Sequence, residues 1–262
     1  MIEERKKIEM EYYDKKAREL LEEKNATGEL SDFEGFKPQI LSSFKRLYEL
    51  LAENSKDKII LDYGCGNGVH SFFSVEKGAK KLIGIDISEK SLEIARRRAE
   101  KLGIPEEKIQ FLRRDCEKTE FPDNYFDIVF DGGSFSSLDL KSVFPEIIRI
   151  LKPGGLLIGI ETFGHNPIAN LKRKLNKVFG KRTGWAEAHI LKTKDLKNAR
   201  KYFSEIQVSF FHFFSYFAIP FLGNPGGGVL LGILEGLDKL FFALPFLRRY
   251  GFKAVFVFKK HD

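Results

Sequence analysis

The stretch Lys58-Ile59-Ile60-Leu61-Asp62-Tyr63-Gly64-Cys65-Gly66-Asn67-Gly68 decides the fold. Its first six residues read as a short apolar strand, and three glycines follow at alternate positions before a helical stretch. Glycines in such a loop let the backbone approach a ligand closely, and the N-terminus of the next helix favours an anionic group. The sequence therefore predicts a small-molecule site where this strand ends.

Strands and helices alternate along the chain after this loop. We predict further apolar strands over residues 82–86, 109–113, 126–130 and 156–160. The helix predicted over 88–102 begins with Ser88 as its N-cap. Continuously apolar strands that alternate with helices are typical of a parallel sheet covered on both faces. Right-handed crossovers then favour an α/β, doubly wound, Rossmann-like fold.

The two ends of the chain depart from this alternation. Residues 1–54 predict an N-terminal helical cap, and residues 55–262 predict the main domain, the two forming one globular unit. Within the main domain we expect a helical insertion over 165–202 and an apolar insertion over 215–249. The predicted elements there are helices over 165–182, 193–201 and 229–247, a Phe-rich strand over 203–214 and a last strand over 253–259.

Composition excludes several protein classes. The 262 residues are 43% hydrophobic and 31% charged, which is the usage of a globular chain. Two cysteines cannot form a disulfide framework, nor a zinc site without other ligands, and we expect no metal. The first sixteen residues contain no apolar core of a signal peptide, so we expect a cytoplasmic protein.

Dinucleotide binding is the first alternative for the glycine loop. That reading requires a third glycine where Val69 stands. Asp62, two residues before the first glycine, would repel a pyrophosphate but could bind a ligand ammonium. Asp86 ends the next strand, 18 residues after Gly68, where an acid can accept both hydroxyls of a ribose. These acids favour a ligand that has a ribose and an ammonium and lacks phosphate.

Five segments, in order and over residues 58–160, resemble motifs of class I S-adenosylmethionine-dependent methyltransferases. They are Leu61–Gly68, Asp86, Asp115-Cys116, Phe126–Phe130 and Leu151–Gly155. The nearest resemblance is to small-molecule methyltransferases of the ubiquinone–menaquinone methyltransferase-like group. It implies a seven-stranded, mostly parallel sheet with an antiparallel last strand, and an apolar insertion between the last two strands.

The resemblance also implies S-adenosylmethionine as cofactor and a role for each matching residue. The methionine end would lie at the glycine loop, the ribose beside Asp86 and Ile87, the adenine at the third strand's loop and the sulfonium after strand four. Tyr12 or Tyr13 could cap the cofactor, although core packing explains either tyrosine as well. The predicted cofactor residues are Asp62, Gly64, Cys65, Gly66, Asp86, Ile87, Asp115, Cys116, Asp131, Gly132 and Tyr13.

The acceptor of the methyl group is less defined by the sequence. Phe163–Pro167 resembles an element of some small-molecule methyltransferases, which makes His165 the first candidate for a general base. Helix capping is an equal alternative for His165, and Glu161 and His189 are the second candidates. The fourth strand is not followed by Asn-Pro-Pro-Tyr or Asp-Pro-Pro-Tyr, which argues against amino-methylation of a nucleobase or a glutamine.

The Phe-rich segment has two interpretations. No formally charged residue occurs from 206 to 234, although Pro and Gly interrupt the run too often for a membrane span. The preferred interpretation is a hairpin of the last two strands plus a buried helix. The alternative is contact with a membrane or a lipophilic substrate through 206–247, aided by the basic segment 172–182.

We therefore expect methyl transfer to a small, lipophilic molecule, at oxygen or carbon, in the cytoplasm, with the membrane periphery as the alternative location. The alternatives are an RNA methyltransferase and a non-catalytic S-adenosylmethionine-binding protein. Nucleic acid ranks lower as a partner, because the aromatic residues do not alternate with the basic ones as stacking platforms do. The oligomeric state stays open.

Overall fold

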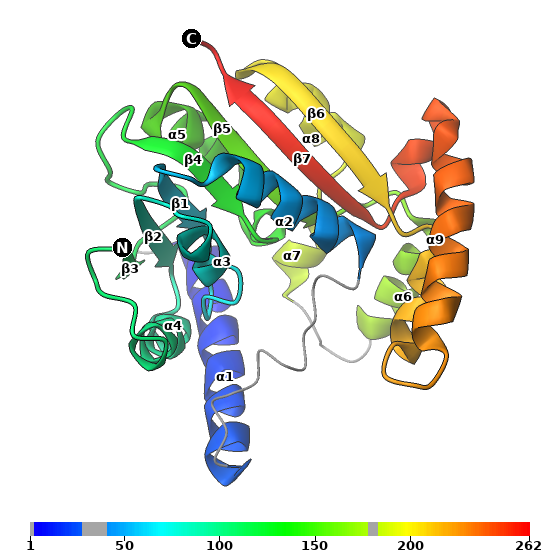
Figure 1. Ribbon diagram of the computed structural model, residues 1–262, viewed down its shortest axis with the longest axis horizontal. Helices are drawn as coiled ribbons and strands as arrows, with labels where there is room; N and C mark the ends of the chain where they lie inside the picture. The colour runs from blue at the N-terminus through cyan, green and yellow to red at the C-terminus, as the bar shows by residue number, and fades with distance from the viewer. Residues whose placement is uncertain (1–2, 28–40, 178–182) are drawn as a thin grey trace.

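The computed structural model describes residues 3–27, 41–177 and 183–262. Its centre is one seven-stranded sheet with the order β3-β2-β1-β4-β5-β7-β6 (Figure 1). The first five strands run parallel, and β7 runs antiparallel to both β5 and β6. The strands are β1 (Ile59–Tyr63), β2 (Lys81–Asp86), β3 (Ile109–Arg113), β4 (Phe126–Asp131), β5 (Leu151–Thr162), β6 (Phe203–Phe211) and β7 (Lys253–Lys260). The predicted sheet with an antiparallel last strand is confirmed.

Helices cover both faces of this sheet, and the sheet separates two hydrophobic cores. Successive residues of a strand point to opposite faces, so Ile60 packs in one core and Leu61 in the other. One core lies under α2, α3 and α4, and the other lies mainly under α5. The α-helices are α1 (Glu4–Thr27), α2 (Ser42–Asn54), α3 (Ser71–Glu76), α4 (Glu89–Lys101), α5 (Leu140–Ile150), α6 (Pro167–Lys177), α7 (Gly184–Ala188), α8 (Thr193–Ala199) and α9 (Gly227–Ala243).

Local signals placed most element boundaries correctly. Ser88 caps α4, because its side chain accepts a hydrogen bond from the Ser91 N–H, as predicted. β5 begins at Leu151, earlier than expected, because the predicted turn continues in strand geometry after a register shift between Phe126 and Ile128. The predicted helix stop at Gly28 and residues 178–182 of the basic helix lie outside the described residues.

The prediction that the apolar helix is buried is wrong. α9 packs on two short 3-10 helices, η3 (Ser215–Phe221) and η4 (Pro245–Tyr250), beside the sheet instead of across it (Figure 1). Since other helices already cover both faces of the sheet, only Gly227, Leu231 and Asp238 of α9 are buried. Within the described residues, every helix is too short or too polar to cross a membrane.

A chain of buried polar groups joins this outlying unit to the main domain. His212 bonds to Ser43 Oγ of α2 through Nε2, at 2.8 Å, and to Ser215 Oγ through Nδ1, at 2.7 Å. Ser215 Oγ lies 2.6 Å from the Asp238 carboxylate on α9, which also accepts the Phe214 N–H. Burial, with Lys253 next, lowers the pKa of His212 to about 4, so this imidazole is neutral near pH 7. The unit is therefore anchored to the main domain by a neutral imidazole and by buried groups that are hydrogen-bonded to one another.

Candidate active site

A pocket opens at the carboxyl ends of β1, β2 and β4, where parallel sheets of this kind bind ligands. About 800 Å³ of space, part of it open to solvent, lies between the lining residues. One face of α1 closes it from above, and the loops after the strands form its base. The pocket is lined by Arg5, Lys6, Glu9, Tyr13, Gly64, Gly66, Asp86, Ile87, Asp115, Cys116, Glu117, Gly132, Gly133, Ser134, Ser137 and Leu138.

The glycine loop turns tightly beneath the pocket. Gly64 and Gly66 have φ angles of +71° and +53°, a region that L-residues with side chains avoid. A Cβ on Gly64 would lie 2.5 Å from the Ser134 Cβ, whereas a Cβ on Gly66 would have no atom within 4 Å. The absent side chains thus let the β1 and β4 loops meet and leave the backbone at Gly66 open towards a ligand.

Asp86 is held by the backbone around it. Its Oδ2 accepts the Gly66 N–H and its Oδ1 accepts the Ser88 N–H, each at 2.8 Å. Burial raises the pKa of Asp86, although these backbone donors act in the opposite direction. A carboxylate oxygen can accept more than one hydrogen bond, so both oxygens keep capacity for a pair of ligand hydroxyls.

Most of the predicted cofactor residues meet in this pocket. The structure brings together Tyr13, Gly64, Gly66, Asp86, Ile87, Asp115, Cys116 and Gly132. Asp62, Cys65 and Asp131 do not line it. The sequence pattern marked the ends of the correct strands, but it could not tell which side chains point into the pocket and which point into the protein.

Asp62 lies beneath the pocket and contacts protein only. It is 2% exposed, and its Oδ2 accepts a hydrogen bond from Ser71 Oγ at 2.5 Å. Burial, with the Asp86 charge next, raises the pKa of Asp62 to about 7. Cys65 turns towards β2 instead, where its Sγ lies 2.9 Å from the position of a Cβ on Gly84.

Asp131 and Glu161 shape the pocket wall from behind. Asp131 Oδ1 accepts the Ser134 N–H and hydroxyl, and Glu161 Oε1 accepts the Phe135 N–H at 2.6 Å. Burial, and then the nearby Glu161 charge, raises the pKa of Asp131 well above its usual range. The two acids hold the loop after β4, so that Gly132 and Ser134 face the pocket.

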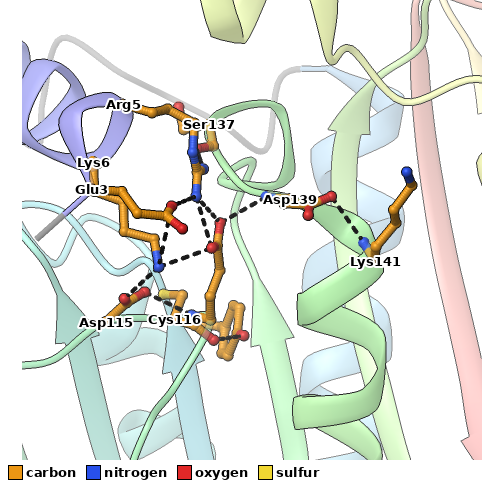
Figure 2. A network of polar contacts seen from close by, with 10 residues as sticks. Glu3, Arg5, Lys6, Asp115, Cys116, Ser137, Asp139 and Lys141 are labelled. Carbon is orange, nitrogen blue, oxygen red and sulfur yellow. Dashed lines mark hydrogen bonds and ion pairs between the residues drawn. The ribbon is translucent and has the colours of Figure 1, made fainter.

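Apart from the predicted Tyr13, the closing face of α1 carries pocket residues that the sequence did not reveal. Lys6 Nζ lies 2.7 Å from Asp115 Oδ2 and 2.9 Å from Glu117 Oε2, and Arg5 lies 2.7 Å from Glu117 (Figure 2). Burial raises the pKa of Glu117, but the Asp139 N–H and the two basic groups outweigh it and lower this pKa overall. Tyr13 adds a 3.0 Å hydrogen bond between its hydroxyl and Ser137 Oγ. The ion pairs between the basic residues of α1 and the acids after β3 depend on how α1 packs, so the sequence alone could not reveal them.

Carboxylates outnumber cations along the pocket wall. Two basic residues line it, Arg5 and Lys6 of α1. The four acids in the lining are Glu9, Asp86, Asp115 and Glu117. An excess of negative charge opposes a phosphate-bearing ligand and favours one with a positive charge. The lining therefore fits a dinucleotide poorly.

The three predicted general bases do not line the pocket. His165 Nε2 accepts the Thr193 N–H at 3.2 Å at the start of α8, which matches the capping alternative. His189 stacks on Trp185 with ring centroids 3.6 Å apart, and Glu161 accepts the N–H groups of Phe135 and Thr162.

Comparison with known proteins agrees with this geometry. Residues 60–155 match the family described as a methyltransferase domain. A demethylmenaquinone methyltransferase of Symbiobacterium thermophilum is 36% identical over 105 residues, which are 39% of this chain and 41% of the relative. A ribosomal protein L11 methyltransferase of Pasteurella multocida is 31% identical over 102 residues, which are 39% of this chain and 33% of the relative.

A solved structure extends the likeness beyond the matched segment. Phosphoethanolamine N-methyltransferase 2 of Haemonchus contortus, in complex with S-adenosyl-L-methionine, superposes with a TM-score of 0.60 at 18% identity. The superposition covers 85% of this chain and 54% of that one. This chain spans less than half the length of the curated relatives that it matches. Residues 60–155 therefore resemble a methyltransferase domain, and the chain has the fold of the class I S-adenosylmethionine-dependent methyltransferases.

Proposed function

We propose that this chain binds S-adenosylmethionine in the pocket under α1 and transfers its methyl group to an acceptor. The observation that carries the proposal is the meeting of the glycine loop, Asp86 and the loops after β3 and β4 around one pocket. The match to the methyltransferase family over residues 60–155 supports it.

The pocket wall fits the parts of this cofactor. Asp86 would accept the ribose hydroxyls, and Ile87, Cys116 and Leu138 offer apolar contacts to the adenine ring. The excess of carboxylates suits a ligand with a sulfonium and an ammonium. Bound there, the cofactor supplies an electrophilic methyl group. The chain's own residues orient the ligand, and α1 with its ion pairs to Asp115 and Glu117 excludes water from above.

Calorimetric titration of S-adenosylmethionine tests this assignment. We expect micromolar binding to the wild type and at least a tenfold loss in Asp86→Ala, because each ribose hydrogen bond to a charged group contributes about 1.5–3 kcal/mol. Thermal unfolding of each variant is the control for folding, because Asp86 also accepts the Gly66 and Ser88 N–H groups through its two oxygens. Absence of S-adenosylmethionine binding, or tighter binding of NAD, would refute the proposal.

We propose a small, lipophilic acceptor, methylated at oxygen or carbon. The demethylmenaquinone methyltransferase among the relatives supports this class, and so does the exposed apolar surface on α9. The test is transfer of a labelled methyl group to demethylmenaquinone, with ribosomal protein L11 as the competing acceptor. Labelling of L11 and not of the quinone would replace this proposal with protein methylation.

We further propose that α9 contacts an anionic membrane surface. Four of its residues form one exposed stripe at helical spacing, Val229, Ile233, Leu237 and Leu240, and Leu244 and Phe246 continue it just beyond the helix. The two acids of α9 are turned inward, because Glu235 accepts the Ser42 N–H and Asp238 accepts the Phe214 N–H. The basic residues Lys239, Arg248 and Arg249 are exposed beside the stripe. Apolar side chains flanked by cations are typical of helices that lie on anionic bilayers.

Vesicle flotation tests the membrane contact. We expect the wild type to float with vesicles that contain phosphatidylglycerol and to bind phosphatidylcholine vesicles less. Ile233→Asp combined with Leu240→Asp should abolish flotation, whereas Leu102→Asp, at an exposed leucine away from the stripe, should not. Flotation of the double variant equal to that of the wild type would overturn the proposal. So would a wild type that binds no vesicles and instead forms a dimer, which the double variant does not form.

A further inference from the structure

A second cavity adjoins the pocket and shares part of its wall. Its empty volume is about 1190 Å³, and it lies between α1, α4 and the start of α7. Three residues line both spaces: Glu9, Tyr13 and Gly66. Glu9 and the open backbone of Gly66 therefore both line the junction of the two cavities.

The two carboxylate oxygens of Glu9 differ, because one accepts a hydrogen bond and the other accepts none from the described residues. Its Oε1 accepts a hydrogen bond from the Thr183 hydroxyl, and Thr183 in turn accepts the Ala186 N–H as the N-cap of α7. Its Oε2 is buried and has no hydrogen-bond partner among the residues that the structure describes. The whole residue is only 4% exposed, so bulk water does not solvate this oxygen. A buried carboxylate oxygen without a donor is unfavourable, because it has lost its hydration, and a ligand with a donor removes that cost.

The acid that the sequence assigned to a ligand ammonium is not available to one. Asp62 lies beneath the glycine loop, does not line either cavity and already binds Ser71. Its raised pKa further weakens it as a partner for a cation at neutral pH. Glu9 faces the same glycine loop from the opposite side, on the helix that closes the pocket.

We propose that Glu9 is the carboxylate that binds the ammonium of the cofactor's methionine end, at the junction of the two cavities. This inference rests on the proposed function, because the ligand is S-adenosylmethionine. A charged hydrogen bond inside a water-poor site is stronger than one at the surface, so Glu9 contributes to affinity for that end of the cofactor only. Thr183 positions Glu9 by fixing its other oxygen.

The test compares two probes, S-adenosylhomocysteine and 5′-methylthioadenosine, the second of which lacks the amino-acid portion. We expect Glu9→Gln to weaken S-adenosylhomocysteine about tenfold to hundredfold in calorimetry, the effect of losing a charged hydrogen bond. Its affinity for 5′-methylthioadenosine should change less than about twofold. Glu11→Gln removes the same charge from an exposed position on α1 and should leave both affinities unchanged.

Each result separates this inference from the proposed function. If the wild type binds neither probe, the proposed function fails. If the wild type binds both and Glu9→Gln weakens neither, the ammonium is not bound by Glu9, and the free oxygen serves a donor in the second cavity instead. Equal weakening of both probes would indicate a general loss of pocket structure and would also overturn the role. Glu9→Asp, which keeps the charge, should bind S-adenosylhomocysteine more tightly than Glu9→Gln does.

Discussion

Replacing Asp62 with Asn should make the protein more stable at neutral pH, although most substitutions destabilise. The carboxyl ionises near 3.8 in the unfolded chain and near 7 in the folded one, where it is 2% exposed. Between these values the unfolded state releases a proton that the folded state keeps, so this group's contribution to stability falls as pH rises from about 4 to 7. The difference corresponds to about 4 kcal/mol, at about 1.36 kcal/mol per pH unit.

The Asp62→Asn variant resembles the protonated acid at every pH, because an amide oxygen can still accept the Ser71 hydroxyl. Urea unfolding at pH 5 and pH 8 measures the effect. We expect the variant to exceed the wild type by up to about 4 kcal/mol at pH 8 and by clearly less at pH 5. Asp127→Asn is the control of opposite sign: burial raises the Asp127 pKa, but Lys152 and the Ile59 N–H lower it overall, so that variant should lose stability at pH 8. A variant at Asp62 that is no more stable than the wild type at pH 8 would refute the reasoning.

Three further predictions concern the glycine loop, the closing helix and the outlying helix. Gly64→Ala should cost about 1–3 kcal/mol in thermal unfolding and weaken cofactor binding, because its Cβ would lie 2.5 Å from the Ser134 Cβ at a φ of +71°; Gly66→Ala, where the space is open, should cost less. Lys6→Met removes the ion pairs of Lys6 with the loop after β3 and leaves the Arg5–Glu117 pair, so limited proteolysis should cut α1 faster than in the wild type, and added salt should narrow this difference in cleavage rate. Asp238→Ala leaves buried donors without an acceptor, and hydrogen exchange in α9 should rise while exchange in β1 stays slow.

The fold could be predicted from the sequence because its signals are local and repeated. Each strand is a short apolar run, and an acid or a glycine loop marks its carboxyl end, as at Asp86 and Gly64. Parallel strands bring those ends to one edge, so the position of the pocket followed from the order of the motifs. The cap at Ser88 was predictable for the same reason, because its partner Ser91 is three residues away.

The site could be predicted only where backbone position decides it. Asp62 and Asp131 stand at strand ends as expected, yet their side chains point into the protein, a property that depends on the pleat and on packing partners. Glu9 is one of many charged residues in α1, and nothing near it in the sequence distinguishes it from exposed Glu11. The exposure of α9 was missed because an apolar sequence indicates burial but does not specify which surface covers the helix.

The pairing of Phe211 with Lys253 has a consequence for how this protein can change over evolutionary time. The segment that holds η3, α9 and η4 leaves the sheet and returns to it at neighbouring residues of an antiparallel pair. Lengthening, shortening or replacing such a segment costs closure entropy that grows only with the logarithm of its length. None of its residues lines the pocket under α1. Evolution can therefore change or replace the segment that holds η3, α9 and η4 while the pocket under α1 stays the same.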